Sequence, residues 1–277
     1  MRRIAATLVL LSVLAAPAAA DEPRGWHPDV AAARGFAAGR QGEVGFAVRT
    51  KHRDWGYNAT ARYRSASVVK AMLLVAYLRR PDVRRRALRP AERALLDPMI
   101  RRSDNRAADA VMRQVGTERL AALGRRAGMR SFAPYPVYWG GSMIDADDQA
   151  RLFLRIDRYV PRRHRAYAMS LLRGVIAAQR WGIAAVVPTG WTIAFKGGWG
   201  KGQTREVDHQ VALLSRGRER VAVAVLTADN PSVGYGFATI RGVAARLLRG
   251  LAGTIVGRAR PGRERLGPHS AIPLRVP

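Results

Sequence analysis

Strand-like segments lie at both ends of this 277-residue chain, and a long helical segment separates them. Short apolar runs between turn signals predict the strands, which are residues 44–48, 55–57, 192–195, 208–214 and 220–227. Their simplest packing is one antiparallel sheet, covered by predicted terminal helices at 29–40 and 233–251. The chain is therefore predicted to be an α/β (α+β) protein, in which a five-stranded antiparallel sheet with flanking helices meets an all-helical lobe at a cleft.

The middle of the chain has the periodicity of amphipathic helices. We expect these helices at 68–78, 90–100, 105–115, 145–159 and 163–179. The α/β lobe is placed at about 28–60 plus 185–252, and the helical lobe at about 61–184, within one domain that spans residues 21–257.

The N-terminus has the three parts of a secretory signal peptide. Arg2 and Arg3 are followed by an apolar stretch at 4–14, too short to span a bilayer comfortably, and by three alanines at 18–20. We predict a signal peptide over 1–20, cleavage after Ala20, and a secreted, extracytoplasmic location in the cell-wall space. The tail at 258–277 is basic and rich in proline, and we expect it to be disordered.

The formal net charge is +28, from 48 Lys and Arg against 20 Asp and Glu, and only four of the basic residues are lysine. This arginine bias is more typical of GC-rich coding than of a nucleic-acid groove. For an exported, monomeric protein we expect no nucleic-acid partner; anionic cell-wall polymers or phospholipid head groups would suit the basic surface. The absence of cysteine excludes disulfides, zinc thiolates and cysteine nucleophiles.

Ser67 and Lys70 are three residues apart at the start of the first predicted helix, so their side chains share a face. A serine hydroxyl becomes a good nucleophile when a neighbouring base takes its proton. A lysine can be that base if burial or a nearby cation lowers its pKa. The pair therefore predicts a serine nucleophile with a lysine base.

Two further short motifs can serve the same chemistry. In Ser103-Asp104-Asn105, a hydroxyl can relay a proton to a leaving amine, and an amide can orient an acyl side chain. In Lys196-Gly197-Gly198, a cation at a strand edge can hold a carboxylate, and the glycines allow a substrate to lie along the edge. The three motifs together are expected by chance on the order of once in 30,000 chains of this composition.

These motifs resemble the SxxK, SDN and K[TS]G motifs of class A beta-lactamases and of the related penicillin-binding D-alanyl-D-alanine peptidases. The likeness extends over about residues 28–251 and agrees with the two-lobed layout. It implies that Ser67 is the acylated nucleophile, Lys70 its general base, and Ser103 the proton relay to the leaving nitrogen.

The same resemblance assigns the substrate contacts. Asn105 would bind the acyl amide, and Lys196 would supply electrostatics for a substrate carboxylate and for the Ser103 hydroxyl. Gly197, Gly198 and Trp199 would line the substrate-binding edge, with an oxyanion hole made by the backbone N–H groups of Ser67 and Trp199. No cofactor and no metal are implied.

The chain departs from the family pattern in three ways. Class A enzymes carry a loop glutamate that activates the deacylating water, whereas no glutamate lies between Arg119 and Arg205 here. Gly197 replaces the hydroxyl residue of K[TS]G, and the interval from Ser67 to Ser103 is shorter than usual. The acids in the glutamate-free region, Asp145, Asp147, Asp148 and Asp157, are expected to cap helices or to be solvated.

We therefore expect a secreted serine hydrolase that forms an acyl-enzyme with beta-lactams or with D-Ala-D-Ala-like amides of peptidoglycan stem peptides, and that deacylates slowly. The alternative is a non-catalytic peptidoglycan-binding module on the same fold, which would not need the proton-transfer groups. The five histidines show no metal-ligand spacing and are expected at the surface.

Overall fold

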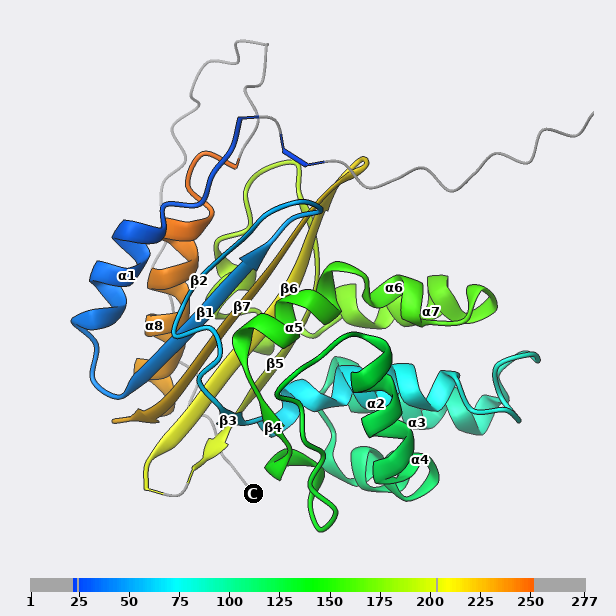
Figure 1. Ribbon diagram of the computed structural model, residues 1–277. Coiled ribbons are helices and arrows are strands. Elements are labelled where there is room, and N and C mark those ends of the chain that lie inside the picture. The colour runs from blue at the N-terminus through cyan, green and yellow to red at the C-terminus, as the bar shows by residue number, and fades with distance from the viewer. Residues whose placement is uncertain (1–21, 24, 203, 252–277) are drawn as a thin grey trace, which may run out of the picture.

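The computed structural model describes residues 22, 23, 25–202 and 204–251 (Figure 1). The predicted signal peptide and the predicted basic tail lie outside these residues. A five-stranded antiparallel sheet in the order β2-β1-β7-β6-β5 forms the centre of the molecule, which confirms the predicted fold class. Its strands are β1 (Glu43–Arg49), β2 (Asp54–Tyr57), β5 (Thr192–Lys201), β6 (Glu206–Arg216) and β7 (Glu219–Asn230).

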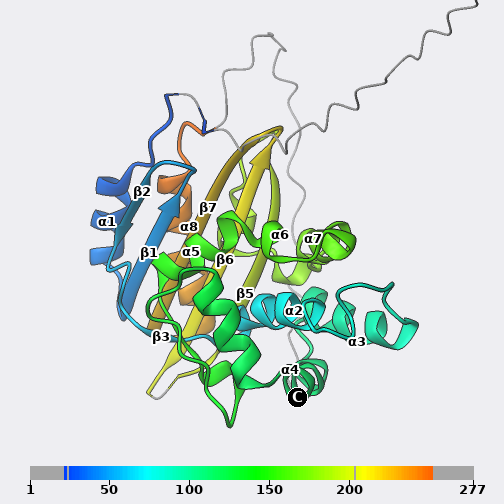
Figure 2. The same cartoon turned by 45° about the vertical axis from the view of Figure 1, so that its right-hand side comes forward.

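The side chains of the central strands alternate between two hydrophobic cores, because successive strand residues point to opposite faces. Along β7, Val221, Val223 and Val225 pack on one face, beneath α1 (Val30–Ala38) and α8 (Val233–Leu247). The alternating residues Ala222, Ala224 and Leu226 join the core of the helical side. Figures 1 and 2 show α1 and α8 side by side on one face of the sheet and α2 to α7 on the other.

The helices of the second face pack in the larger of the two hydrophobic cores. They are α2 (Lys70–Leu78), α3 (Pro90–Arg101), α4 (Asn105–Arg126), α5 (Ala146–Leu154), α6 (Ile156–Tyr159) and α7 (Arg165–Arg173). Every residue of α2 is buried, as expected for a helix that is apolar on all sides. A 3₁₀ turn, η1 (Ala66–Val69), leads directly into α2 and carries Ser67.

Some boundaries differ from the sequence prediction for local reasons. Helical structure continues through α4 to Arg126, with a kink at Gly116, where φ is +72°. The predicted helix at 145–159 is divided at Arg155 into α5 and α6. A two-stranded sheet of β3 (Tyr63–Arg64) and β4 (Met143–Ile144) was not predicted, because two-residue strands carry no periodic signal. No helix within the described ranges is long and apolar enough to cross a bilayer.

Candidate active site

Ser67 lies in the tight η1 turn between β3 and α2. The preceding residue, Ala66, has φ of +43°, an unfavourable conformation for a residue with a Cβ atom. The turn is anchored by a hydrogen bond from the backbone N–H of Ser65 to the carbonyl of Ser142, at 2.7 Å. Strained backbone of this kind persists only where the surroundings hold it in place, and it is concentrated at functional sites.

The edge strand β5 passes close to the Ser67 backbone at Gly198. A Cβ atom on residue 198 would lie 2.7 Å from the backbone nitrogen of Ser67 and 2.8 Å from that of Val68. Any larger residue would therefore push β5 away from the serine turn. The structure thus brings the K-G-G segment, including the predicted edge residues Gly197 and Trp199, beside the predicted nucleophile.

The Lys70 amine is fully buried and donates three hydrogen bonds. Its acceptors are the carbonyl of Ser103 at 2.5 Å, the Ser103 hydroxyl at 3.2 Å and the side-chain oxygen of Asn105 at 2.7 Å. The Ser67 hydroxyl is not among the acceptors that the described residues offer to this amine. For Lys70 to take a proton from Ser67, its amine would first have to turn away from these acceptors, and catalytic hydrogen bonds often form only in the substrate complex.

The hydroxyl of Ser103 lies between two amines. Lys196 Nζ donates to it at 3.0 Å and to the carbonyl of Gly197 at 2.8 Å. Ser103 itself has φ of +61°, so its backbone is strained like that of Ala66. The structure thus gathers four predicted site residues, Lys70, Ser103, Asn105 and Lys196, into one hydrogen-bonded network.

Burial lowers the pKa of Lys70 to about 7, although the charges of Asp104 and Asp109 act in the opposite direction. Burial and, next, the charge of Lys70 hold the pKa of Lys196 well below its usual value. Two amines that share one hydroxyl in a buried site resist carrying a positive charge at the same time. Near neutral pH the site can therefore hold an uncharged lysine, which is what a general base requires.

Two residues that sequence analysis did not select shape the surroundings of the Lys70 amine: Trp139 covers it, and Asp109 holds Trp139. The ring of Trp139 has its centroid 4.5 Å from Lys70 Nζ, and its indole N–H donates to Asp109 Oδ1 at 2.7 Å. Asp109 was detectable in principle, because it lies one helical turn after Asn105 on α4. Trp139 could not have been found in this way, because its contact with Lys70 depends on a loop whose path the sequence does not predict.

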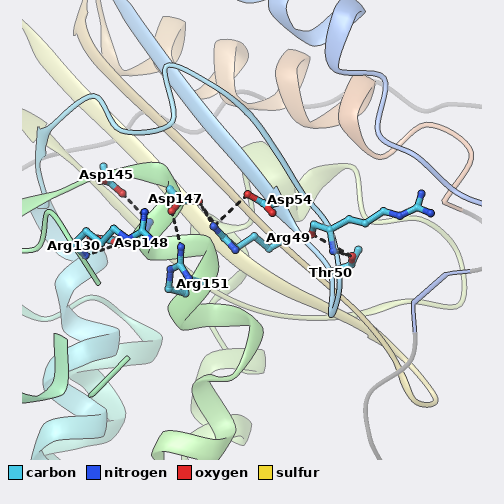
Figure 3. Close-up of polar contacts among 9 residues, drawn as sticks. Arg49, Thr50, Asp54, Arg130, Asp145, Asp147, Asp148 and Arg151 are labelled. Carbon is cyan, nitrogen blue, oxygen red and sulfur yellow. Dashed lines mark hydrogen bonds and ion pairs between the residues drawn. The ribbon is translucent and has the colours of Figure 1, made fainter. Parts of the chain in front are cut away.

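The four aspartates of the glutamate-free region have structural partners, and Figure 3 shows those of Asp145, Asp147 and Asp148. Asp145 caps a helix as expected, whereas the other three are neither helix caps nor solvated but lie in buried or partly buried contacts. Asp145 caps α5 by accepting a hydrogen bond from the backbone N–H of Asp148 at 2.7 Å. Asp147 binds the guanidinium groups of Arg49 and Arg151 at 2.5 and 3.1 Å. The carboxylate of Asp148 accepts hydrogen bonds from the backbone N–H groups of Arg130 and Ser131. Asp157 forms an ion pair with the guanidinium of Arg220.

The prediction of surface histidines is wrong for His164 and His209, which are buried. The Nε2–H of His209 donates to the carbonyl of Arg64 at 2.8 Å, and its Nδ1 accepts from the backbone N–H of Thr227 at 3.2 Å. Burial lowers the pKa of His209 to about 4, so the ring is neutral and ties β6 to the segment before Ser67. The part of the chain that the structure describes contains no group of three or more His, Cys, Asp or Glu residues able to hold a metal ion.

Comparisons with known proteins agree with this architecture. A model of the beta-lactamase enzyme family matches residues 85–251, a range that includes Ser103, Asn105 and Lys196 and begins after Ser67 and Lys70. Comparison with curated proteins gives no significant match.

Several solved structures share the fold. A beta-lactamase from Sphaerobacter thermophilus is 22% identical with a TM-score of 0.67, and covers 81% of this chain and 97% of its own. A class A beta-lactamase from Mycobacterium abscessus is 21% identical, also with a TM-score of 0.67, over 81% of this chain and 98% of its own. A representative of class A beta-lactamase from Bacteroides cellulosilyticus has a TM-score of 0.69 at 12% identity, over 79% of this chain and 95% of its own. With more than half of its length matched by the family model, the chain belongs to the beta-lactamase enzyme family and is a serine hydrolase of the beta-lactamase type that acts on amide bonds.

Proposed function

We propose that this protein is a secreted active-site-serine enzyme that forms an acyl-enzyme on Ser67 with beta-lactams or with D-Ala-D-Ala-like amides. The observation that carries the proposal is the buried network of Lys70, Ser103 and Lys196 beside the Ser67 turn. A lysine whose pKa lies at about 7 can accept a proton at the pH at which a free lysine is fully protonated.

In the proposed acylation step, the Ser67 hydroxyl oxygen attacks the substrate carbonyl while neutral Lys70 takes its proton. The backbone N–H groups of Ser67 and Trp199 stabilise the oxyanion that forms on the carbonyl oxygen. The bond from carbon to nitrogen then breaks, and the Ser103 hydroxyl protonates the leaving nitrogen. The Lys70 ammonium returns the proton to Ser103, which it already contacts in the free enzyme.

Asn105 and Lys196 position the substrate in this proposal. The Asn105 amide binds the acyl amide of the substrate. Lys196 polarises the Ser103 hydroxyl through its 3.0 Å hydrogen bond. The N-terminal segment, if it is a signal peptide, delivers the enzyme to the cell-wall space, where stem peptides and anionic polymers occur.

Deacylation is proposed to be slow, because the loop in the place of the family's glutamate carries no base to activate the hydrolytic water. The loop at 134–142 contains no side chain that is a base near neutral pH, and Trp139 covers Lys70. Loss of a well-placed general base typically costs about 10²–10⁴ in rate. The acyl-enzyme is therefore expected to accumulate, as it does in penicillin-binding proteins.

Mass spectrometry of the intact protein after mixing with a penicillin tests this proposal. We expect a stoichiometric adduct that survives for minutes or longer, that is absent in Ser67→Ala and that persists in Ser170→Ala, a control at an exposed serine on α7. Hydrolysis of many penicillin molecules per second would contradict slow deacylation. Absence of an adduct with every beta-lactam and D-Ala-D-Ala peptide tried, together with retention on peptidoglycan, would favour the non-catalytic binding module.

A further inference from the structure

Three aromatic side chains form a cluster beside the K-G-G edge of β5, which we call the aromatic wall: Trp181, Trp199 and Phe237. Trp181 stacks on Phe237, with ring centroids 3.8 Å apart and an interplanar angle of 10°. Trp199 meets both rings edge-on, at 5.8 and 6.4 Å. All three are only half-buried, so the wall keeps a surface open to solvent.

The wall occupies the space that a side chain at residue 197 would need. A Cβ atom on Gly197 would lie 2.9 and 3.0 Å from Cζ2 and Cη2 of Trp181. Gly197 is not among the described glycines with a positive φ, so its backbone conformation does not demand glycine. Glycine stands at 197 because the indole fills the place of a side chain.

The Trp181 indole is held in this place from both sides. The adjacent turn η5 (Gly182–Ala185) is fixed to the sheet by a hydrogen bond from the Ala184 N–H to the side-chain oxygen of Gln210, at 3.1 Å. Ile183 in the same turn is fully buried in the core beneath α8. The stack on Phe237 then limits rotation of the ring, so the wall is pre-organised.

In the proposed acylation step the leaving group lies along the K-G-G edge, and the wall flanks that edge at Gly197 and Trp199. Alternation along β5 directs Lys196 and residue 198 toward Ser103 and Ser67, and Gly197 and Trp199 toward the opposite face, where the wall stands. The Lys196 amine is already bonded to Ser103 and to the Gly197 carbonyl. At Gly197 the site therefore presents aromatic carbon where a serine or threonine would present a hydroxyl.

We propose that the aromatic wall is the leaving-group subsite and that it selects amides or esters whose leaving group is uncharged and flat at the position where penicillins and D-Ala-D-Ala peptides carry a carboxylate. A carboxylate pressed against aromatic carbon loses hydration without gaining a hydrogen bond. A planar apolar group gains ring contacts instead. This inference rests on the proposed acyl-enzyme at Ser67. It keeps the acylated carbonyl of the proposed substrates and replaces the carboxylate of their leaving group by an uncharged group.

A matched pair of substrates, benzylpenicillin and its methyl ester, tests the inference on the wild-type protein. The second-order rate constant for acylation of Ser67 is measured for each by mass spectrometry. We expect the ester to react at least as fast as the acid. A tenfold or greater preference for the acid would overturn the inference while leaving the proposed acyl-enzyme intact. Absence of an adduct with both compounds would contradict the proposed function, and the subsite assignment would fall with it.

Variants of the wall test whether it causes the difference between the acylation rates of the ester and the acid. Trp181→Leu should slow the ester about tenfold and the acid much less, because the loss falls on ring contacts. The double variant Gly197→Thr with Trp181→Ala makes room for a hydroxyl and should raise the ratio of acid to ester rates tenfold or more. Trp55→Leu, on the opposite edge strand of the same sheet, is the matched control and should keep the wild-type ratio. An unchanged ratio in both site variants would refute the assignment.

Discussion

Two oxygen atoms of Ser103, in its hydroxyl and its carbonyl, hold both buried lysines of the site. Its hydroxyl accepts hydrogen bonds from both buried amines, and its carbonyl accepts a third from Lys70. The left-handed backbone at Ser103 directs the hydroxyl and the carbonyl toward the same amine, Lys70. Conformations of this kind cost roughly 1–3 kcal/mol each, so the surrounding contacts must offset that cost.

The acylation rate should follow the protonation of Lys70. Because burial places its pKa at about 7, the neutral fraction rises with pH, and the rate should increase about tenfold between pH 6 and pH 8. Lys70→Arg should abolish acylation, since guanidinium stays protonated. Stopped-flow or mass-spectrometric acylation rates check both expectations, with Lys51→Arg at an exposed lysine as the control. A rate that is flat from pH 5 to 9 would exclude Lys70 as the base.

The strain at Ala66 predicts a stabilising substitution. Glycine adopts positive φ at no steric cost, while its greater freedom in the unfolded chain offsets part of the gain. Ala66→Gly should therefore raise Tm by about 1–4 °C. In Ala71→Gly, a control in the regular part of buried α2, calorimetry should show a lower Tm instead. If Ala66→Gly also lowers Tm, the backbone at 66 carries no strain.

At the scale of elements, the strands were predictable because each is a short apolar run between turn signals. All five predicted strands are present, and the cross-strand register then aligns Lys196, Gly197 and Gly198 along one edge. Helix ends were harder to predict, because Gly116 bends the chain without ending its helical structure and Arg155 ends α5 without a glycine or proline. In both cases tertiary packing outweighs the local signal.

A buried carboxyl between β6, β7 and α8 should make stability depend on pH. Asp208 accepts a hydrogen bond from Asn230 Nδ2 at 2.8 Å, but its Oδ1 is buried without a partner among the described residues. Burial raises the pKa of Asp208 to about 7, although the hydrogen bond from Asn230 acts to lower it. The folded protein therefore binds this proton more tightly than the unfolded chain does, and stability falls as pH rises from about 4 to 7.

Asp208→Asn removes the ionisation and should raise Tm by several degrees at pH 8, with little change at pH 4. Differential scanning calorimetry at the two pH values measures the difference. Asp97→Asn, at an exposed carboxyl on α3, should show no such pH dependence. An equal change in Tm at both pH values would mean that Asp208 is not protonated in the folded state.

At the scale of the whole molecule, the site depends on contacts between distant parts of the chain. The sequence predicts which residue types can act, because Ser67, Lys70, Ser103 and Lys196 occur in short recognisable motifs. It does not predict that Trp139 covers Lys70 or that Trp181 fills the space at Gly197, since these contacts span 69 and 16 residues with irregular loops between. Such contacts arise when the sheet packs against the helices, and no local sequence pattern encodes that packing.

One ion-pair cluster joins the sheet to the helices and should contribute to stability. Asp147 at the start of α5 binds Arg49 of β1 and Arg151 one helical turn further along. Burial alone would raise the pKa of Asp147, but its hydrogen bonds with the two guanidinium groups hold the pKa below the usual value. The stabilisation is therefore present at neutral pH and is lost as the pH falls through the lowered pKa.

Asp147→Asn should cost about 1–3 kcal/mol at pH 7, because it leaves two partly buried guanidinium groups without their anion. Urea unfolding at pH 7 measures this loss, which should shrink below about pH 4. Glu118→Gln, which breaks an exposed pair with Arg125, should leave the midpoint unchanged. A loss of the same size at pH 3 would show that the charge of Asp147 is not what stabilises the contact.

The scarcity of lysine has a practical consequence for chemical modification. Of the four lysine side chains, Lys51 and Lys201 are exposed, whereas Lys70 and Lys196 are fully buried in the network around Ser103. An amine-selective reagent should therefore attach dyes, cross-linkers or a solid support at these two lysines and at the α-amino group, and leave the site untouched. Modification of Lys70 or Lys196 would require the site to open. The rate at which these two lysines react, followed by peptide mapping, therefore measures how often the lobes separate.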